Sequence, residues 1–182
     1  GSIGREILYN VGFNVSDYKS KVMSLNFNEE KSLGYLYEGM MAGEIWGYRW
    51  DGFYSVDDFK DTATWQLKDG VTGITGSSPR PGDFKYKNLR DNEYSDEDTG
   101  MINSGKGTAN NPGDMTVIGN STPRFQYGFN FNISYKGFDL GIMIQGIGKR
   151  DYAAINPYTY TLSASDPGWF PVFAGTTNYW KP

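Results

Sequence analysis

The segment from Phe125 to Tyr135 alternates strictly between two kinds of side chain. Successive side chains of a β-strand point to opposite faces of the sheet, so the pattern predicts a strand with one apolar face and one polar face. The odd positions are aromatic or β-branched: Phe125, Tyr127, Phe129, Phe131, Ile133 and Tyr135. The even positions are small or polar and uncharged: Gln126, Gly128, Asn130, Asn132 and Ser134.

Two further segments carry the same signal, near residues 6–16 and 138–146. The first has apolar residues at every odd position from Ile7 to Val15, and the second has them at every even position from Phe138 to Ile144. Lys136-Gly137 predicts a tight hairpin turn before the last strand, because glycine accepts a positive φ. Ile147 falls on the polar side, which predicts a bulge or a strand end after Gln145.

The composition agrees with an all-β fold and excludes several kinds of site. Aromatic residues make up 16% of the chain and 24 residues are glycine, which is typical of β-rich proteins. The sequence has no cysteine and no histidine, so thiolate metal sites and Ser-His or Cys-His nucleophiles are excluded. Acidic and basic residues are interspersed at a net charge of −4, which argues against a nucleic-acid partner.

The connections between the predicted strands differ greatly in length. A long stretch, 19–122, separates the first strand from the second, and another long irregular region begins at residue 156. Short turns at one end and long loops at the other are typical of transmembrane β-barrels, whose strands need about 9–11 residues to cross the bilayer. A soluble β-sandwich also has alternating strands. Alternation by itself is therefore equally compatible with a barrel and with a sandwich.

A resemblance to a known family favours the barrel. The segment Asn111–Tyr152 contains a Pro-Gly-Asp turn, the run TVIGNSTPR, an aromatic strand, YKGFDL, and QG followed by GKRD. It resembles the C-terminal barrel region of the SusC/RagA family of TonB-dependent outer-membrane transporters. GEIWGY with DGF near residue 44, PGDFKYK near residue 81 and the closing TNYW agree as well.

This resemblance implies an all-β fold that is part of a large antiparallel transmembrane β-barrel. Residues 1–182 would be its C-terminal portion, with about three barrel strands and long extracellular loops at 19–122 and 156–182. The plug, the TonB-contacting segment and most strands would lie outside this sequence. The implied location is the outer membrane of a Gram-negative cell envelope. The implied activity is uptake of oligosaccharides or peptides with a SusD-like surface lipoprotein, powered through TonB and without enzymatic chemistry.

Under this interpretation the odd-numbered face from Phe125 to Tyr135 contacts lipid, and the even-numbered face lines the lumen. An aromatic group in the long loop is a candidate contact for a glycan, although packing within the loop or against a partner is the interpretation we favour. Trp169, Phe170 and Phe173 are further candidates for a contact with the lipoprotein. The group in the long loop is Trp46, Tyr48, Trp50, Phe53 and Tyr54.

Charged residues of the loops suggest weaker hypotheses. The acidic run Asp91–Asp98 lacks the central glycine expected of a calcium loop, so a solvated loop is favoured and no cofactor is predicted. Arg124 is expected either to pair with a carboxylate such as Asp114 or to remain solvated. Carboxylate pairs such as Asp57 with Asp58 lack any supporting motif for a glycosidase.

Two alternatives to the transporter remain at this point. One is a secreted carbohydrate-binding β-sandwich that uses the aromatic loop, and the other is a soluble carboxylate glycosidase. The transporter and the β-sandwich involve no enzymatic chemistry, whereas the glycosidase requires it.

Overall fold

The computed structural model describes residues 1–4, 6–90 and 100–153, and within them the fold is all-β with antiparallel strand ladders. The main sheet has the order β1-β2-β7-β8, formed by Ser2–Ile3, Ile7–Ser16, Arg124–Tyr135 and Phe138–Lys149. Two small sheets pair β3 (Glu44–Gly47) with β6 (Thr116–Asn120) and β4 (Trp50–Phe53) with β5 (Phe84–Tyr86). A 3-10 turn, η1, covers Val56–Asp58.

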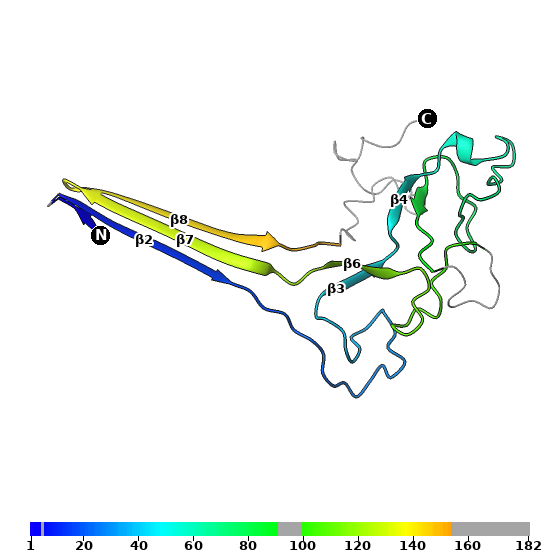
Figure 1. Cartoon of the computed structure of the whole chain (residues 1–182), viewed down its shortest axis with the longest axis horizontal. Helices are drawn as coiled ribbons and strands as arrows, with labels where there is room; N and C mark the ends of the chain where they lie inside the picture. The colour runs from blue at the N-terminus through cyan, green and yellow to red at the C-terminus, as the bar shows by residue number, and fades with distance from the viewer. Residues whose placement is uncertain (5, 91–99, 154–182) are drawn as a thin grey trace, which may run out of the picture.

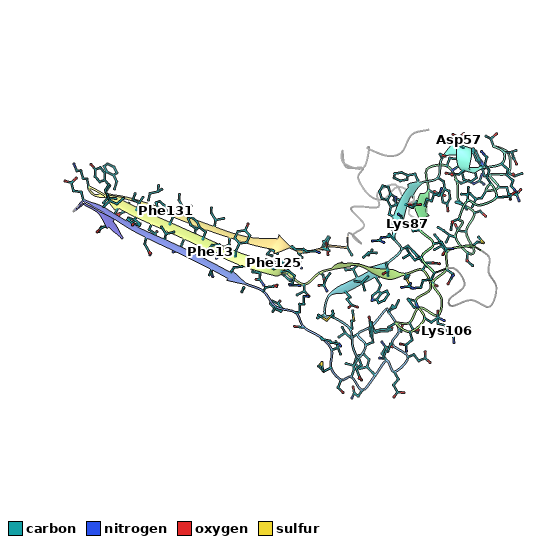
Figure 2. The ribbon with its side chains drawn as sticks, in the orientation of Figure 1. Phe13, Asp57, Lys87, Lys106, Phe125 and Phe131 are labelled. Atoms are coloured by element: carbon teal, nitrogen blue, oxygen red, sulfur yellow. The ribbon has the colours of Figure 1, made fainter. Side chains whose placement is uncertain are left out.

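The main sheet is long and narrow, and most of the other described residues are gathered at one end of it (Figure 1). The N-terminus and the β7–β8 turn lie at one end of the main sheet, while β3, β4 and β6 lie beyond its other end. We call residues 18–90 and 100–123 the loop body. Figure 2 shows Phe13, Phe125 and Phe131 along the main sheet, and Asp57, Lys87 and Lys106 in the loop body.

The three strands predicted from alternation are present, and their register is regular. Phe129 pairs with Phe13 on one side and with Ile144 on the other, and every partner assigned along β2, β7 and β8 follows this register. The predicted turn is also confirmed: Lys136 and Gly137 have φ values of 47° and 85°, as a two-residue hairpin turn with matching twist requires.

The predicted end or bulge after Gln145 is wrong. Strand β8 continues to Lys149, and the pairs Gln126–Ile147 and Arg124–Lys149 keep the register of the rest of the hairpin. The irregularity lies instead on the partner strand, where Phe125 has a positive φ of 54°. Cross-strand pairing therefore holds Ile147 in the strand although its side chain breaks the apolar and polar alternation.

The loop body has a hydrophobic core of its own. Tyr54 and Ile102 are fully buried, and Tyr37, Met40 and Phe59 are nearly so. The Tyr54 hydroxyl donates to the Thr72 carbonyl at 2.7 Å, which satisfies its polar end inside this core. The expected long connection 19–122 is therefore a folded unit in its described residues, and it includes β6 as well as the strand-like piece near Trp46.

A buried carboxylate joins three segments of this unit. Asp114 is fully buried, and its Oδ1 accepts hydrogen bonds from the amides of Leu89 and Arg90 at 2.8 and 3.1 Å. Its Oδ2 accepts one from the Asn103 amide at 2.9 Å. The preceding Gly113 has a φ of 57°, and a Cβ there would lie 2.3 Å from the Gly105 nitrogen, which explains the glycine of the Pro-Gly-Asp turn.

Several polar contacts hold the loop body against the outer end of the main sheet. The Asn120 amide donates to the Asp151 carboxylate at 2.8 Å, and Arg150 Nε donates to the Ser121 carbonyl at 3.0 Å, so residues just after β8 hold the chain between β6 and β7. Arg124 makes a two-pronged ion pair with Asp17, and this hydrogen bonding lowers the pKa of Asp17 to about 2. The expected partner Asp114 is therefore wrong for Arg124, because that carboxylate is enclosed by main-chain donors elsewhere.

We predict that Asp114→Ala will loosen the loop body while leaving the main sheet intact. It leaves the amides of Leu89, Arg90 and Asn103 without their acceptor, and each unpaired buried donor costs about 1–3 kcal/mol. Hydrogen exchange of the full-length protein should become faster in residues 88–90 and 103. Asp69→Ala is the matched control, since its carboxylate is exposed and forms a surface ion pair with Lys60. Unchanged exchange in the Asp114 variant would contradict this role.

Candidate functional site

One face of the main sheet is apolar along its whole length. The register brings the odd positions of β2 and β7 beside the even positions of β8, so that rows such as Val11, Phe131 and Ile142 cross the sheet. Phe13 is 69% exposed and Phe138 is 81% exposed, and no other sheet of the described residues packs against them. The face consists of Ile7, Tyr9, Val11, Phe13, Val15, Tyr127, Phe129, Phe131, Ile133, Tyr135, Phe138, Leu140, Ile142 and Ile144.

The opposite face carries mainly asparagine, glutamine, serine and glycine. Asn130 lies over Gly12, where a Cβ would meet its Oδ1 at 2.5 Å, and Asn14 lies over Gly128 in the same way at 2.4 Å. Leu8, Met143 and Ile147 are the apolar exceptions. The charged residues of this face are Asp139 near the turn and Arg124 and Lys149 at the outer end, so the middle of the sheet carries hydrogen-bonding amides without ionic groups.

Phe125 differs from the five other residues predicted to contact lipid. It alone among them has a positive φ, and its ring lies 5.1 Å from the Arg124 guanidinium carbon. It also stands next to the Arg124–Asp17 ion pair at the end of β7. Phe125 therefore belongs to the junction between the main sheet and the loop body.

The aromatic group predicted in the long loop is divided between different places. Tyr54 is a core residue. Trp46 donates its Nε1–H to Glu44 Oε2 at 3.3 Å, and Tyr37 donates to the same oxygen at 2.9 Å. Burial and this hydrogen bond raise the pKa of Tyr37 to about 12, so its phenol stays a proton donor to Glu44. Neither Trp46 nor Tyr54 belongs to an exposed surface that a ligand would reach directly.

The remaining members join two residues that were not predicted. Phe53 stacks on Phe84 with ring centroids 5.4 Å apart, and Trp50 meets Phe53 edge-on at 5.9 Å. Tyr86 continues the row to Tyr48 at 5.5 Å. Trp50, Phe53 and Phe84 are all exposed, at 58%, 41% and 56%. We call Tyr48, Trp50, Phe53, Phe84 and Tyr86 the aromatic strip.

The strip follows from the pairing of β4 with β5. Phe53 pairs with Phe84 and Trp50 with Tyr86, so rings from segments thirty residues apart lie side by side. The alternation Phe84-Lys85-Tyr86 is the sequence signal that would have revealed the second half of the strip. Lysines beside it are paired, Lys85 with Asp58 at 3.2 Å and Lys87 with Asp51 at 3.4 Å.

Asp58, from the carboxylate pair considered for catalysis, and Glu44 are both held by hydrogen-bond donors. Asp58 accepts from the Ser55 amide as well as from Lys85, and Glu44 accepts from Tyr37, Trp46 and the Met41 amide. Across residues 1–4, 6–90 and 100–153, no cluster of acidic side chains is arranged to hold a metal. The acidic run Asp91–Asp98 and the residues Trp169, Phe170 and Phe173 lie outside the described residues.

The part of the chain that the structure describes contains no helix with the length and apolarity needed to span a membrane. No protein-family model matches the chain, and no solved structure matches it. It is similar to TonB-dependent receptor P3 of Formosa agariphila, with 24% identity over 190 aligned residues. The alignment covers 98% of this chain and 16% of that receptor. This similarity supports a relationship to TonB-dependent receptors, with the chain corresponding to about a sixth of such a protein.

We predict that the rings of Phe53 and Phe84 stabilise each other. A double-mutant cycle with Phe53→Ala and Phe84→Ala should give a coupling free energy of about 1 kcal/mol for this stacked pair. The measurement is the opening free energy of β4 and β5 amides by hydrogen exchange in the full-length protein. The same cycle with Phe53 and Tyr35, an exposed ring outside the strip, should give no coupling. Strictly additive effects for Phe53 and Phe84 would contradict the stacking.

Proposed function

We propose that the chain forms part of the wall and outer loops of a TonB-dependent outer-membrane importer of the SusC/RagA type. The observation that carries this proposal is the exposed apolar face of the main sheet, backed by a face whose middle part carries mainly uncharged amides and glycines. The similarity to a TonB-dependent receptor supports the transporter class. The motifs between Asn111 and Tyr152 support the SusC/RagA type.

In this function the apolar face contacts the hydrocarbon of the bilayer. Strand β2 has 10 residues, and β7 and β8 have 12 each. A tilted barrel strand needs about 9–11 residues to cross, so these lengths suffice. Tyr127 and Tyr135 lie near opposite ends of β7, where Tyr rings favour the two membrane interfaces. The amide face then lines a hydrated lumen beside a plug supplied by another part of the full-length protein.

The loop body stands at the end of the main sheet opposite the two-residue turn. In the proposed importer it forms the extracellular side of the wall, where barrel loops are long. Its folded core and its contacts with Arg150 and Asp151 hold it at the rim of the lumen. A SusD-like surface lipoprotein would close over this rim. Oligosaccharides or peptides captured there would enter when TonB pulls on the plug, and none of these steps requires bond-making chemistry from this segment.

A secreted β-sandwich is less well supported. A sandwich buries the apolar face of one sheet against a second sheet about 10 Å away. The two small sheets belong to the loop body, and within residues 1–4, 6–90 and 100–153 neither covers the apolar face.

Paired substitutions on the two faces of β7 test the membrane assignment. We expect Phe129→Asp to impair assembly of the full-length protein, because a mid-bilayer carboxylate is unfavourable by roughly 2 kcal/mol or more. Asn130→Asp, one residue away on the polar face, should assemble normally. Outer-membrane fractionation with heat-modifiability gels measures both variants. Equal assembly of the two, or recovery of the native protein in the soluble fraction, would exclude the lipid contact.

Partnership with a lipoprotein is tested by co-purification. A SusD-like lipoprotein should remain bound to the tagged full-length importer extracted in mild detergent. Replacing residues 19–122 by a short turn should release it, while a variant with Asn130→Asp should retain it. If the importer from native membranes carries no such lipoprotein, the SusC/RagA part of the proposal is wrong even if the protein is an outer-membrane transporter.

A further inference from the structure

A groove adjoins one end of the aromatic strip. It lies between residues 48–50, at the start of β4, and residues 116–118 of β6, and it has a volume of about 410 Å³. Trp50 and Tyr48 of the strip line it together with Arg49, and Leu89, Val117 and Ile118 supply apolar surface. Trp50 therefore belongs both to the groove and to the row of exposed rings that leads away from it.

Arg49 gives the groove a positive charge that no carboxylate of the described residues pairs with. The residue is exposed. The neighbouring cations Lys85 and Lys87 are each matched to an aspartate. No other residue lining the groove carries a charge. A ligand that fills this groove is therefore expected to present one anionic group beside an apolar face.

We propose that the groove binds an acidic saccharide, a sugar ring that carries a carboxylate or a sulfate ester. Trp50 stacks against the C–H face of the ring, and the Arg49 guanidinium binds the anionic group through its planar fork of N–H donors. The role of this binding in nutrient capture rests on the proposed function, whereas the presence of the groove does not. Carboxylates and sulfate esters share this chemistry, and the experiment distinguishes them.

The aromatic strip favours a saccharide over an acidic peptide. Beyond Trp50 the exposed rings of Phe53 and Phe84 continue the surface. An oligosaccharide presents a C–H face on each successive sugar, so neighbouring units can contact neighbouring rings while their hydroxyl groups stay in water. An acidic peptide would satisfy Arg49 but offers no repeated flat face to the strip.

The test uses the full-length protein in detergent and isothermal titration calorimetry. The probes are an oligogalacturonate, a sulfated carrageenan oligosaccharide, a neutral cello-oligosaccharide and an oligoglutamate peptide. Arg49→Gln should weaken binding of an acidic saccharide about tenfold or more, the usual effect of losing a charge-assisted hydrogen bond. Trp50→Ala should weaken that binding too. Whichever of the two acidic saccharides binds more tightly identifies the anionic group.

Two substitutions elsewhere in the loop body serve as matched controls. Arg80→Gln removes an exposed arginine that does not line the groove, and Tyr35→Ala removes a ring that is 69% exposed and outside the strip. Neither should change the affinity for an acidic saccharide. Equal affinities of Arg49→Gln and Arg80→Gln would overturn the proposal. A second outcome would also overturn it. In that outcome the oligoglutamate peptide binds as tightly as the acidic saccharides, and its binding is lost in Arg49→Gln but unchanged in Trp50→Ala.

The outcome is separable from that of the proposed function. A protein that fractionates with the outer membrane and binds no acidic saccharide refutes the groove assignment alone. A soluble protein that binds acidic saccharides through Arg49 and Trp50 refutes the importer alone.

Discussion

The common register of β2, β7 and β8 is the constraint on which the rest of the structure depends. Since side chains alternate strictly along each strand, a slip of one residue in any strand would bring asparagines among the phenylalanines. The observed register keeps rings and branched aliphatic side chains together across the whole sheet. No other element of the described chain packs against the apolar face or the amide face of this sheet. Both faces are therefore open to contacts with groups outside the described residues.

The loop body solves a different problem, which is how a long connection keeps a shape. It has a small aromatic and aliphatic core around Tyr54 and Ile102, and a buried carboxylate at Asp114. Its β3–β6 ladder leads directly into β7 through Ser121 to Pro123, and the Arg124–Asp17 ion pair closes the junction. The aromatic strip and its groove are therefore presented on a supported surface rather than on a loose loop.

Much of the main sheet could be predicted from residues alone. Alternation located its three long strands, and Lys136-Gly137 located its turn. The prediction was wrong where pairing overrides local pattern: Ile147 stays in β8 because Gln126 pairs with it. The segment from Glu44 to Trp50 is one run of strand-like residues in the sequence, but it is divided between β3 and β4 because β6 and β5 pair with its two halves.

The candidate site was harder to predict because its contacts join distant segments. Trp50 and Phe53 were identified as candidate glycan contacts, but their partners Phe84 and Tyr86 come from a strand more than thirty residues later. Tyr54 stands beside Phe53 in the sequence, yet it faces the core because neighbouring residues of an extended chain point in opposite directions. Arg124 pairs with Asp17 rather than Asp114 because the ends of β2 and β7 are neighbours in the sheet. Local sequence patterns do not show which strand ends are neighbours.

The way Asp114 holds the loop body has an evolutionary consequence. Its carboxylate contacts Leu89, Arg90 and Asn103 through their main-chain amides, and every amino acid except proline has such a group. The side chains of Leu89 and its neighbours can therefore be exchanged without removing the hydrogen bonds that keep these segments in place. Since Leu89 also lines the groove, related proteins have a simple route to new ligand preferences on an unchanged framework.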